Sequence, residues 1–262
     1  MTGVIAMPDS GRRPGAHLSE APCADCSACP HRNTLLPAGR CQPGDVCLIA
    51  ESGRQIDRFL RRNPEFAEVC LGDPFWERRA IAVRYALANS VTGLIKDRDE
   101  VMRRAVALRL LPDALMALAQ DPDREVRITV ASRLPPERLE VLINDPDYMV
   151  RQRVAERLPH GKLTRLAHDP EREVRKEVAR RLPAFALGRM ANDEDPEVRA
   201  IAASRALPDD AAHLLDDPEW RVRLEAVARA SIEAVAALVD DPDRDVRERV
   251  RNRLTDFLQA KE

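Results

Sequence analysis

The sequence predicts an all-α fold, a solenoid of 24-residue helical repeats that follows a small, irregular, cysteine-rich segment. Three observations predict it. Asp recurs every 24 residues without a gap, from Asp73 to Asp241. Apolar residues within each unit are spaced three or four positions apart, as on one face of a helix. Five of the six cysteines lie between Cys23 and Cys47, before the repeats begin.

The composition excludes several classes of protein. The 262 residues are 33% charged but only 3% aromatic, and the formal net charge is -2. This balance gives no overall charge that would attract nucleic acid or an anionic membrane. Residues 1–15 contain no apolar run typical of a secretory signal, and no stretch reaches the roughly 20 apolar residues of a membrane helix. The sequence therefore predicts a cytoplasmic protein without a membrane partner, in which the cysteines stay reduced.

The first element, residues 1–48, is expected to be a metal-cluster domain, with residues 1–20 flexible. Its cysteines follow the pattern C-x₂-C-x₂-C-P, eleven residues, C-x₅-C. The candidate ligands, four of which are needed, are Cys23, Cys26, Cys29, Cys41 and Cys47. Thiolates at three-residue spacing can converge on a compact cubane, and a later cysteine completes the four that a [4Fe–4S] cluster takes. Pro and Gly residues prevent regular structure here, so the metal is expected to organise the segment.

Two questions stay open at this point. The first two cysteines and the last are favoured as ligands, while Cys29 and Cys41 compete for the fourth place. Zinc, held by four cysteines or by three cysteines and His31, is the alternative cofactor. The spare cysteine makes His31 an improbable ligand, because the thiols already exceed the number required.

Residues 49–72 are expected to form a degenerate repeat that caps the N-terminal end of the stack. The segment lacks the Asp-Pro start, but Pro64 and Cys70 occupy the positions of the repeat's proline and of its recurrent Leu. Cys70 is therefore interpreted as a buried core residue rather than a ligand. The segment also carries an arginine-rich stretch, which predicts a solvated, salt-bridged helix face or a partner-docking site beside the cysteines. These arginines are Arg54, Arg58, Arg61 and Arg62.

Residues 73–262 comprise eight repeats, which we number from the Asp as position 1. Asp-Pro predicts a helix start, because Asp caps free N–H groups and Pro fits the first helical position. Positions 6, 10 and 14 follow a helical spacing, and Pro at position 15 or 16 ends the helix. We expect a helix of roughly 13 residues, then a short, partly 3₁₀ helix around positions 19, 22 and 23. In the last repeat, Arg251 and Gln259 replace apolar residues, which predicts a polar end cap.

Arginine recurs at two positions that face the stack. Position 7 is Arg in every repeat, and position 13 is Arg in the last seven. At about 100° per residue, both fall within or at the edge of the apolar arc. We therefore expect these side chains to be buried and paired with carboxylates, foremost the recurrent Asp, or with helix-end carbonyls. The alternative, a row of arginines gripping a phosphate backbone, requires exposed guanidinium groups.

The cysteine-rich start, the run Ser-Gly-Arg-Gln-Ile-Asp-Arg-Phe at 52–59 and the 24-residue units resemble the leucine-rich repeat variant proteins with an N-terminal 4Fe–4S cluster. The resemblance covers the chain from about residue 20 to its end. It implies a right-handed superhelix of alternating α and 3₁₀ helices without strands. It also implies a [4Fe–4S] cluster and a setting among nitrogen-fixation genes, but no known activity.

Two functions from different classes follow. The first is a scaffold that binds a protein partner on the solenoid surface and carries a cluster for electron transfer or for redox or iron sensing. The second, less favoured, is a nucleic-acid-binding solenoid with a structural metal cluster. An enzyme is not expected, because the sequence contains no phosphate-binding loop or nucleophile motif. Its five histidines are scattered along the chain.

Overall fold

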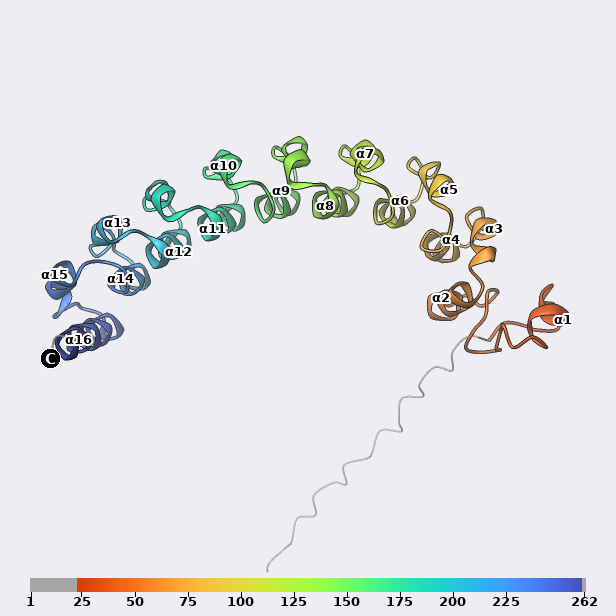
Figure 1. Ribbon diagram of the computed structural model, residues 1–262, viewed down its shortest axis with the longest axis horizontal. Coiled ribbons are helices and arrows are strands. Elements are labelled where there is room, and N and C mark those ends of the chain that lie inside the picture. Colours follow the sequence, from red (N-terminus) through yellow and green to blue (C-terminus); the bar gives the residue numbers. More distant parts are fainter. Residues whose placement is uncertain (1–22, 261–262) are drawn as a thin grey trace, which may run out of the picture. The chain divides into compact units, whose positions relative to one another are not determined.

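The structure, a computed structural model, describes residues 23–260 (Figure 1). The flexibility expected of residues 1–20 concerns positions outside this range. The chain divides into two compact units, one ending at Gly93 and one beginning at Leu94. Over residues 23–260 the regular structure is helical, with one isolated bridge between Gln42 and Val46 and no strand. The predicted all-α class is confirmed. None of the described helices is both long and apolar enough to span a membrane.

The first unit contains the cysteine segment, which we define as residues 23–48, the degenerate repeat and the first full repeat. Its helices are α1 (Arg32–Leu35), α2 (Gly53–Arg62), η1 (Pro64–Phe66), α3 (Ala67–Cys70), α4 (Trp76–Ala82) and α5 (Ala88–Thr92). Residues 36–52 between α1 and α2 contain turns and the isolated bridge but no helix. The cysteine segment is therefore mostly irregular, as its Pro and Gly content predicts.

The second unit consists of the remaining repeats, each with one long helix and, in all but the last, a short second element. The long helices are α6 (Glu100–Ala107), α8 (Arg124–Arg133), α9 (Tyr148–Ala155), α11 (Arg172–Arg181), α12 (Pro196–Arg205), α14 (Trp220–Val227) and α16 (Arg244–Gln259). The short elements are α7 (Pro112–Leu115), η2 (Met116–Leu118), η3 (Pro136–Leu142), α10 (His160–Leu163), η4 (Thr164–Leu166), η5 (Ala184–Arg189), α13 (Pro208–His213), α15 (Ile232–Val235) and η6 (Ala236–Leu238). The predicted mixture of α and 3₁₀ turns is confirmed.

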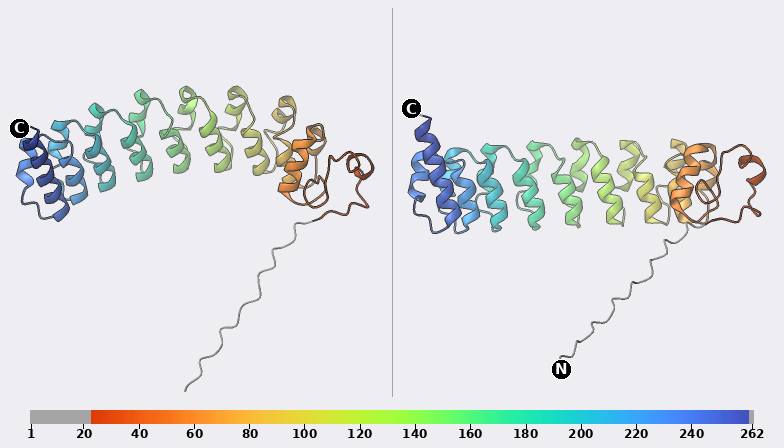
Figure 2. Two further views of the ribbon diagram at one scale, coloured as in Figure 1. Left: turned by 60° about the horizontal axis from the view of Figure 1, so that its bottom comes forward. Right: turned by 90° about the horizontal axis from the view of Figure 1, so that it is seen from below.

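Within the second unit the helices form two layers. Consecutive long helices contact one another and make an inner row, while the short elements make an outer row (Figure 1). Figure 2 shows the long helices standing side by side along this unit. Each repeat therefore buries its apolar face against its neighbours, as expected of a solenoid.

The long helices begin later and are shorter than predicted. Those of the second unit, except the last, have 8–10 residues. The Asp at position 1 does not cap the helix, because its Oδ1 accepts the N–H of position 3, as between Asp121 and Asp123 at 2.9 Å. Position 3 is the N-cap. The predicted Asp-Pro helix start is therefore wrong by two residues, except where the pair itself is shifted to Asp195-Pro196.

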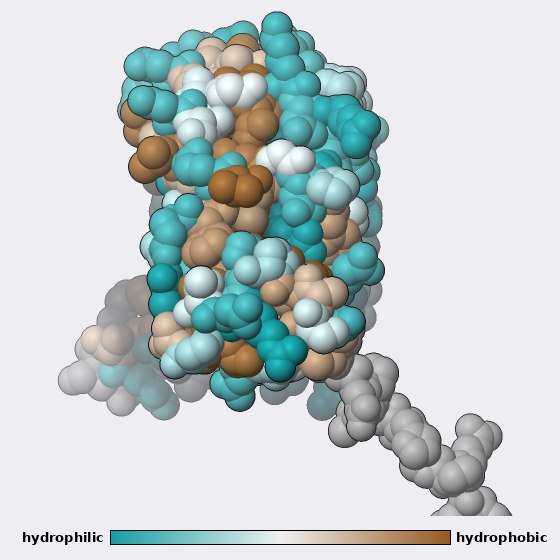
Figure 3. All heavy atoms as spheres, turned by 90° about the vertical axis from the view of Figure 1, so that its right-hand side faces the viewer, coloured by the Kyte–Doolittle hydropathy of each residue, from teal (hydrophilic) through white to brown (hydrophobic). Residues whose placement is uncertain are grey.

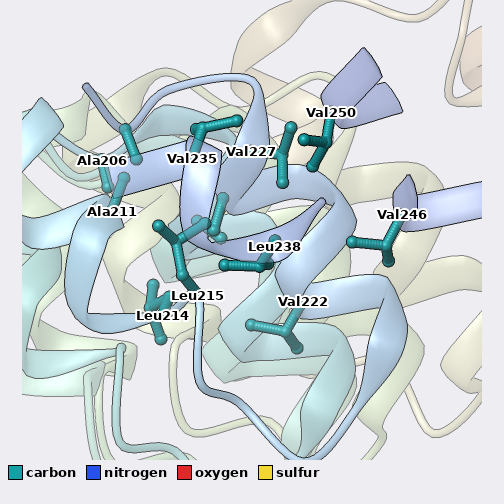
Figure 4. Packing of buried hydrophobic residues seen from close by; sticks show 13 residues of the cluster. Ala206, Ala211, Leu214, Leu215, Val222, Val227, Val235, Leu238, Val246 and Val250 are labelled. Carbon is teal, nitrogen blue, oxygen red and sulfur yellow. The ribbon is translucent and has the colours of Figure 1, made fainter. Parts of the chain in front are cut away.

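Aliphatic side chains fill the core of each repeat. Positions 6, 10 and 11 of the long helix and positions 19 and 22 of the short element supply most of it. Figure 4 shows this packing around α14, α15 and α16, where Val222, Val235 and Val246 are fully buried. Burial of one such side chain stabilises the fold by about 1.5–3 kcal/mol. The stack therefore reaches a dense core without the aromatic residues that the composition lacks.

The position-7 arginines of the second unit bind the recurrent Asp of the following repeat. Arg151 Nε and Nη2 donate to the two carboxylate oxygens of Asp169 at 2.7 and 2.9 Å, and its Nη1 donates to the Asp145 carbonyl at 2.7 Å. The same bidentate contact joins Arg103 to Asp121, Arg127 to Asp145, Arg175 to Asp193, Arg199 to Asp217 and Arg223 to Asp241. We call these six pairs the Arg–Asp ladder. The predicted burial and pairing with Asp are confirmed.

The position-13 arginines point the other way along the stack. Arg181 Nη1 donates to the carbonyls of Ala155 and Leu158, at 2.5 and 2.9 Å, in the preceding repeat. The last carbonyls of a helix have no partner within the helix, so these contacts satisfy them. Equivalent contacts to the preceding repeat are made by Arg133, Arg157, Arg205, Arg229 and Arg253. The second predicted partner, a helix-end carbonyl, is confirmed as well.

Candidate metal centre

Two turns present the cysteines. The first spans Cys26 to Cys29, where the Cys29 N–H donates to the Cys26 carbonyl at 3.4 Å. The Arg32 N–H then donates to the Cys29 carbonyl at 3.2 Å, which leads the chain into α1. Because the turn reverses the chain over three residues, both thiols are presented from one short loop.

The second turn is a tight hairpin. Gln42 and Val46 exchange two backbone hydrogen bonds of 2.8 Å, and Gly44 between them has φ +75°. A side chain at Gly44 would be strained by this conformation, although nothing lies within 4 Å of a Cβ added there. Cys41 and Cys47 flank the paired residues directly. The hairpin thus brings together two cysteines that are six positions apart in the sequence.

Four of the five predicted ligands line one pocket. They are Cys26, Cys29, Cys41 and Cys47. Apolar side chains, among them Val46 and Phe59, form much of the remaining wall. Burial raises the pKa of the Cys26 and Cys41 thiols, and neighbouring cysteines raise it further, foremost Cys47 for Cys26 and Cys29 for Cys41. Cys26 and Cys41 therefore each lie in the electrostatic field of the other pocket cysteines, and Cys23 also contributes to the shift at Cys26.

Cys23 lies outside this pocket. It is exposed, and its Sγ lies 3.7 Å from the Ala24 carbonyl. His31 does line the pocket, but its ring stacks edge-on against Phe66, with centroids 5.1 Å apart. Cys70 is only 3% exposed in α3, and burial raises the pKa of its thiol to about 11. The interpretation of Cys70 as a core residue is confirmed.

The hairpin is fastened to the degenerate repeat. Arg40, just before the hairpin, pairs with Glu65, and Asp45, within it, pairs with Arg58. Asn63, which is fully buried, donates from Nδ2 to the Arg40 carbonyl at 3.0 Å. The Cys41–Cys47 half of the site is therefore positioned by α2 and the residues just after it.

Arg78 is a structural residue that the sequence analysis missed. It occupies position 6 of the first full repeat, where the later repeats have Val or Met. Its Nε donates to the Leu48 carbonyl at 2.8 Å, beside Cys47, and its Nη1 binds both carboxylate oxygens of Asp73 at 2.7 Å. Gln55 stands where the ladder would place an arginine for Asp73, so Arg78 replaces that partner. The sequence signal that could have revealed it is an arginine at position 6, where the other repeats have an apolar residue.

The arginine-rich face of α2 is partly neutralised. Arg58 pairs with Asp45, and both Arg61 and Arg84 pair with Asp57. Figure 3 shows one face of the molecule, on which hydrophobic residues are interleaved with hydrophilic ones. The predicted salt-bridged helix face is confirmed, whereas partner docking on it stays a prediction.

The donor set fits a metal cluster. Four thiols around one pocket supply the ligand number of an iron–sulfur cluster, and an apolar wall limits the access of water. Four thiolates also satisfy zinc. Within residues 23–260, however, no three His, Cys, Asp or Glu side chains converge on a single point as the ligands of one ion would.

Comparison with known proteins decides between the two metals. Residues 22–69 match the family model described as the LRV protein FeS4 cluster, so the cofactor is an iron–sulfur cluster. Residues 124–147 and 172–195 match the model of the leucine-rich repeat variant, and both matches begin at the first residue of a long helix.

One curated relative is described as an "Uncharacterized 27.7 kDa protein in nifB 3'region" of Rhodobacter capsulatus. It is 39% identical over 86 residues, which cover 33% of this chain and 35% of the relative. The chain thus spans about a third of the length of the curated relative it matches.

A solved structure described as a leucine-rich repeat variant with a novel repetitive protein structural motif is similar over most of the chain. It aligns with a TM-score of 0.85 and 56% identity, covering 89% of this chain and 100% of that one. Taken with the cluster-domain match, this similarity shows that the chain belongs to the leucine-rich repeat variant family and carries that family's N-terminal iron–sulfur domain.

Proposed function

We propose that this protein binds a protein partner through its repeats and uses its cluster to transfer an electron or to sense redox state or iron supply. The observation that carries the proposal is the single pocket lined by four thiols, in a segment that matches an iron–sulfur family model. An iron–sulfur cluster supplies one-electron chemistry at a potential set by the charge, hydrogen bonds and exposure around its sulfurs.

We assign the cluster ligands to Cys26, Cys29, Cys41 and Cys47. Two turns supply two cysteines each, and all four line the same pocket. Cys23 is left as the spare, in contrast to the sequence-based preference. A ligand set built from two turns and fastened to α2 is held by the protein rather than by the metal alone.

Charge around the pocket supports a redox role. Arg32 lies close enough to Cys26 to oppose the rise of its pKa, and so favours its thiolate. Arg40 is neutralised by its ion pair with Glu65. The positive charge near the sulfurs therefore comes mainly from Arg32, and positive charge favours the reduced cluster.

The nitrogen-fixation setting is part of the proposal. It is supported by the partial match to a protein encoded in a nifB 3' region.

The Arg–Asp ladder favours a protein partner over a nucleic acid. Binding of a phosphate backbone requires arginines that are free to release counterions. Each ladder arginine instead donates to a carboxylate and to a carbonyl, and its side chain is at most 14% exposed. The test is a salt titration of DNA and RNA binding. Tight binding that falls steeply with salt would favour the nucleic-acid alternative.

The cluster itself is tested on anaerobically purified protein. We expect about four iron and four sulfide per chain, and a paramagnetic signal on reduction that appears without loss of iron. Ser substitution at Cys26, Cys29, Cys41 or Cys47 should abolish the cluster. Cys23→Ser is the matched control in the same segment and should retain it. Stoichiometric zinc would contradict the redox role, and retention of the cluster in Cys29→Ser or Cys41→Ser would contradict the ligand set.

A further inference from the structure

The last repeat contains a position-7 arginine for which the described residues supply no carboxylate partner. Arg247 occupies position 7, and its Nη1 donates to the Asp241 and Pro242 carbonyls at 2.5 and 2.9 Å, as in the other repeats. In six other repeats this arrangement directs Nε and Nη2 at an Asp carboxylate, over 2.7–3.1 Å. No carboxylate within residues 23–260 forms an ion pair with Arg247. The guanidinium is thus positioned for a carboxylate that the stack does not supply.

The rest of this end differs from the surfaces on which the other repeats stack. Position 11 is a small, fully buried residue in the other repeats, such as Ala155 and Val227, but it is the exposed Arg251 here. Helix α16 runs for 16 residues, so its own next turn satisfies carbonyls that a following arginine binds elsewhere. A stacked repeat would have to bury Arg251. The end is therefore capped against stacking, while the orientation of Arg247 is retained.

The exposed stripe of α16 has a defined chemistry. At about 100° per residue, Arg244, Arg247 and Arg251 fall within about 60° of one another, and Leu254 and Leu258 lie along the same line. Leu258 is 65% exposed. The acidic residues Asp245 and Asp256 fall on the opposite side, and Glu248 lies at the edge. This face combines three cations with the exposed side chain of Leu258, while Leu254 packs partly against the core, and so complements an acidic, partly apolar surface.

We propose that this face of α16 binds an acidic segment of a partner protein, one that presents an Asp carboxylate to Arg247 as an Asp-Pro turn does inside the stack. The ladder supplies the argument for the ligand, because the same group in the same setting holds an Asp six times in this molecule. The proposal rests on the protein-binding part of the proposed function. It does not depend on the cluster.

The test uses full-length protein and a synthetic peptide that copies residues 238–246, which contain the Asp241-Pro242 turn. Titration is followed by NMR through the Arg247 Nε–Hε signal. We expect a saturable shift of this signal, and weakening of about fivefold or more when the peptide carries Asn in place of Asp241. Arg247→Lys keeps the charge but loses the fork, and should weaken binding similarly. Arg249→Lys, on the opposite side of α16, is the matched control and should bind as wild type.

Three outcomes would overturn the proposal. Equal binding of the Asp and Asn peptides would show that no carboxylate is recognised. Tighter binding of duplex DNA, with the same dependence on Arg247, would assign the face to phosphate. A dimer in sedimentation velocity that Arg247→Lys dissociates would assign it to a second copy of the chain. Repeating the titration on Cys26→Ser protein separates this proposal from the cluster, because peptide binding should persist without iron.

Discussion

The repeats of the second unit and the cysteine segment differ in what holds them in place. Each ladder repeat is tied to its neighbour by the same contacts: a bidentate Arg–Asp pair, an arginine on helix-end carbonyls and an aliphatic core. The cysteine segment has none of this periodicity. It consists of two turns joined to α2 and the residues after it by single contacts, such as Asn63 to the Arg40 carbonyl.

This difference shows that one region of the chain provides stability while another provides the metal ligands. In the ladder every guanidinium and carboxylate has a partner, and the repeats from Asp73 onward contain no cysteine. In the cysteine segment four thiols share a pocket, and burial together with the neighbouring cysteines raises the pKa of Cys26 and Cys41, which opposes thiolate formation until a metal binds. We therefore expect removal of the metal to disrupt the cysteine segment, and acid to destabilise the repeats.

Removal of the cluster should cause the largest loss of structure, and this loss should be confined to the cysteine segment. Treatment with chelator and oxidant should leave the far-UV circular dichroism nearly unchanged, because the helices of the second unit contain no ligand. Limited proteolysis should then cut within residues 23–48, where metal-free turns have few contacts. Loss of most of the helical signal on iron removal would contradict the independence of the repeats.

Acid should destabilise the repeats rather than the cysteine segment. The Arg223 hydrogen bond holds the pKa of Asp241 below its usual 3.8. For Asp217, burial acts to raise the pKa, but the Arg199 hydrogen bond and other contacts outweigh it and leave it lowered. A carboxyl with a lowered pKa in the folded state stabilises above its unfolded pKa and loses that contribution as pH falls through the folded value. Unfolding free energy should therefore be steady at neutral pH and fall below about pH 4.

The control for this prediction is Asp241→Asn, which cannot titrate. It should be less stable than wild type at pH 7, yet should lose less further stability between pH 5 and pH 3. A stability that does not change over this range in wild type would mean that the ladder contributes little.

Arg151→Ala tests one step of the ladder. It leaves the Asp169 carboxylate, 3% exposed, without its bidentate partner. We expect a loss of about 2–4 kcal/mol in the unfolding free energy measured with denaturant. Glu156→Ala removes only a short-range pair with Arg153 on the outer surface, and should cost within about 0.5 kcal/mol. Equal effects of the two substitutions would argue against the ladder as a stabilising element.

Much of the repeat architecture could be predicted because each feature is repeated. The Asp period, the inward position of Arg151 and its equivalents, and the aliphatic core all follow from register and helical geometry. The helix start could not be predicted in the same way. Asp at position 1 can accept the N–H of a helix or of a turn, and sequence alone does not show that the next polar residue, such as Asp123, takes the capping role.

The site could be predicted in composition but not in geometry. Cysteine spacing named the five candidates, yet it could not show that the Gln42–Val46 hairpin places Cys41 beside Cys47. Spacing also favoured Cys23, which lies at the edge of the run and outside the pocket. Such outcomes depend on the two hydrogen bonds of the hairpin and on the conformation of Gly44, which the 24-residue period does not predict.

Arg78→Met should lower the unfolding free energy by less than Arg151→Ala does. It should affect both the first full repeat and the cysteine segment. Met fits the apolar column, but the change removes the donors to the Leu48 carbonyl and to Asp73. We expect a loss of about 2–3 kcal/mol, together with faster loss of iron on exposure to chelator. Val126→Met, at the same position in a later repeat, is the control and should leave the rate of iron loss unchanged. Wild-type iron retention in Arg78→Met would mean that this arginine does not support the site.

The comparison between Cys70 and Cys23 should give the smallest effect. Cys70 is a thiol buried in the core of a repeat, whereas Cys23 is an exposed thiol of the cysteine segment. The Cys70 pKa of about 11 leaves only about one thiol in a thousand ionised at pH 8, so Cys70 should resist alkylation in the folded protein. The exposed Cys23 should react quickly under the same conditions, even with the cluster in place.

Cys70→Ser places a hydroxyl in the apolar core and should lower the unfolding free energy by about 1–2 kcal/mol, while the iron content stays that of wild type. Mass spectrometry of alkylated peptides checks the first expectation, and denaturant unfolding with iron analysis checks the second. Rapid alkylation of Cys70 in protein that keeps its cluster would show that the degenerate repeat opens more readily than its buried core indicates.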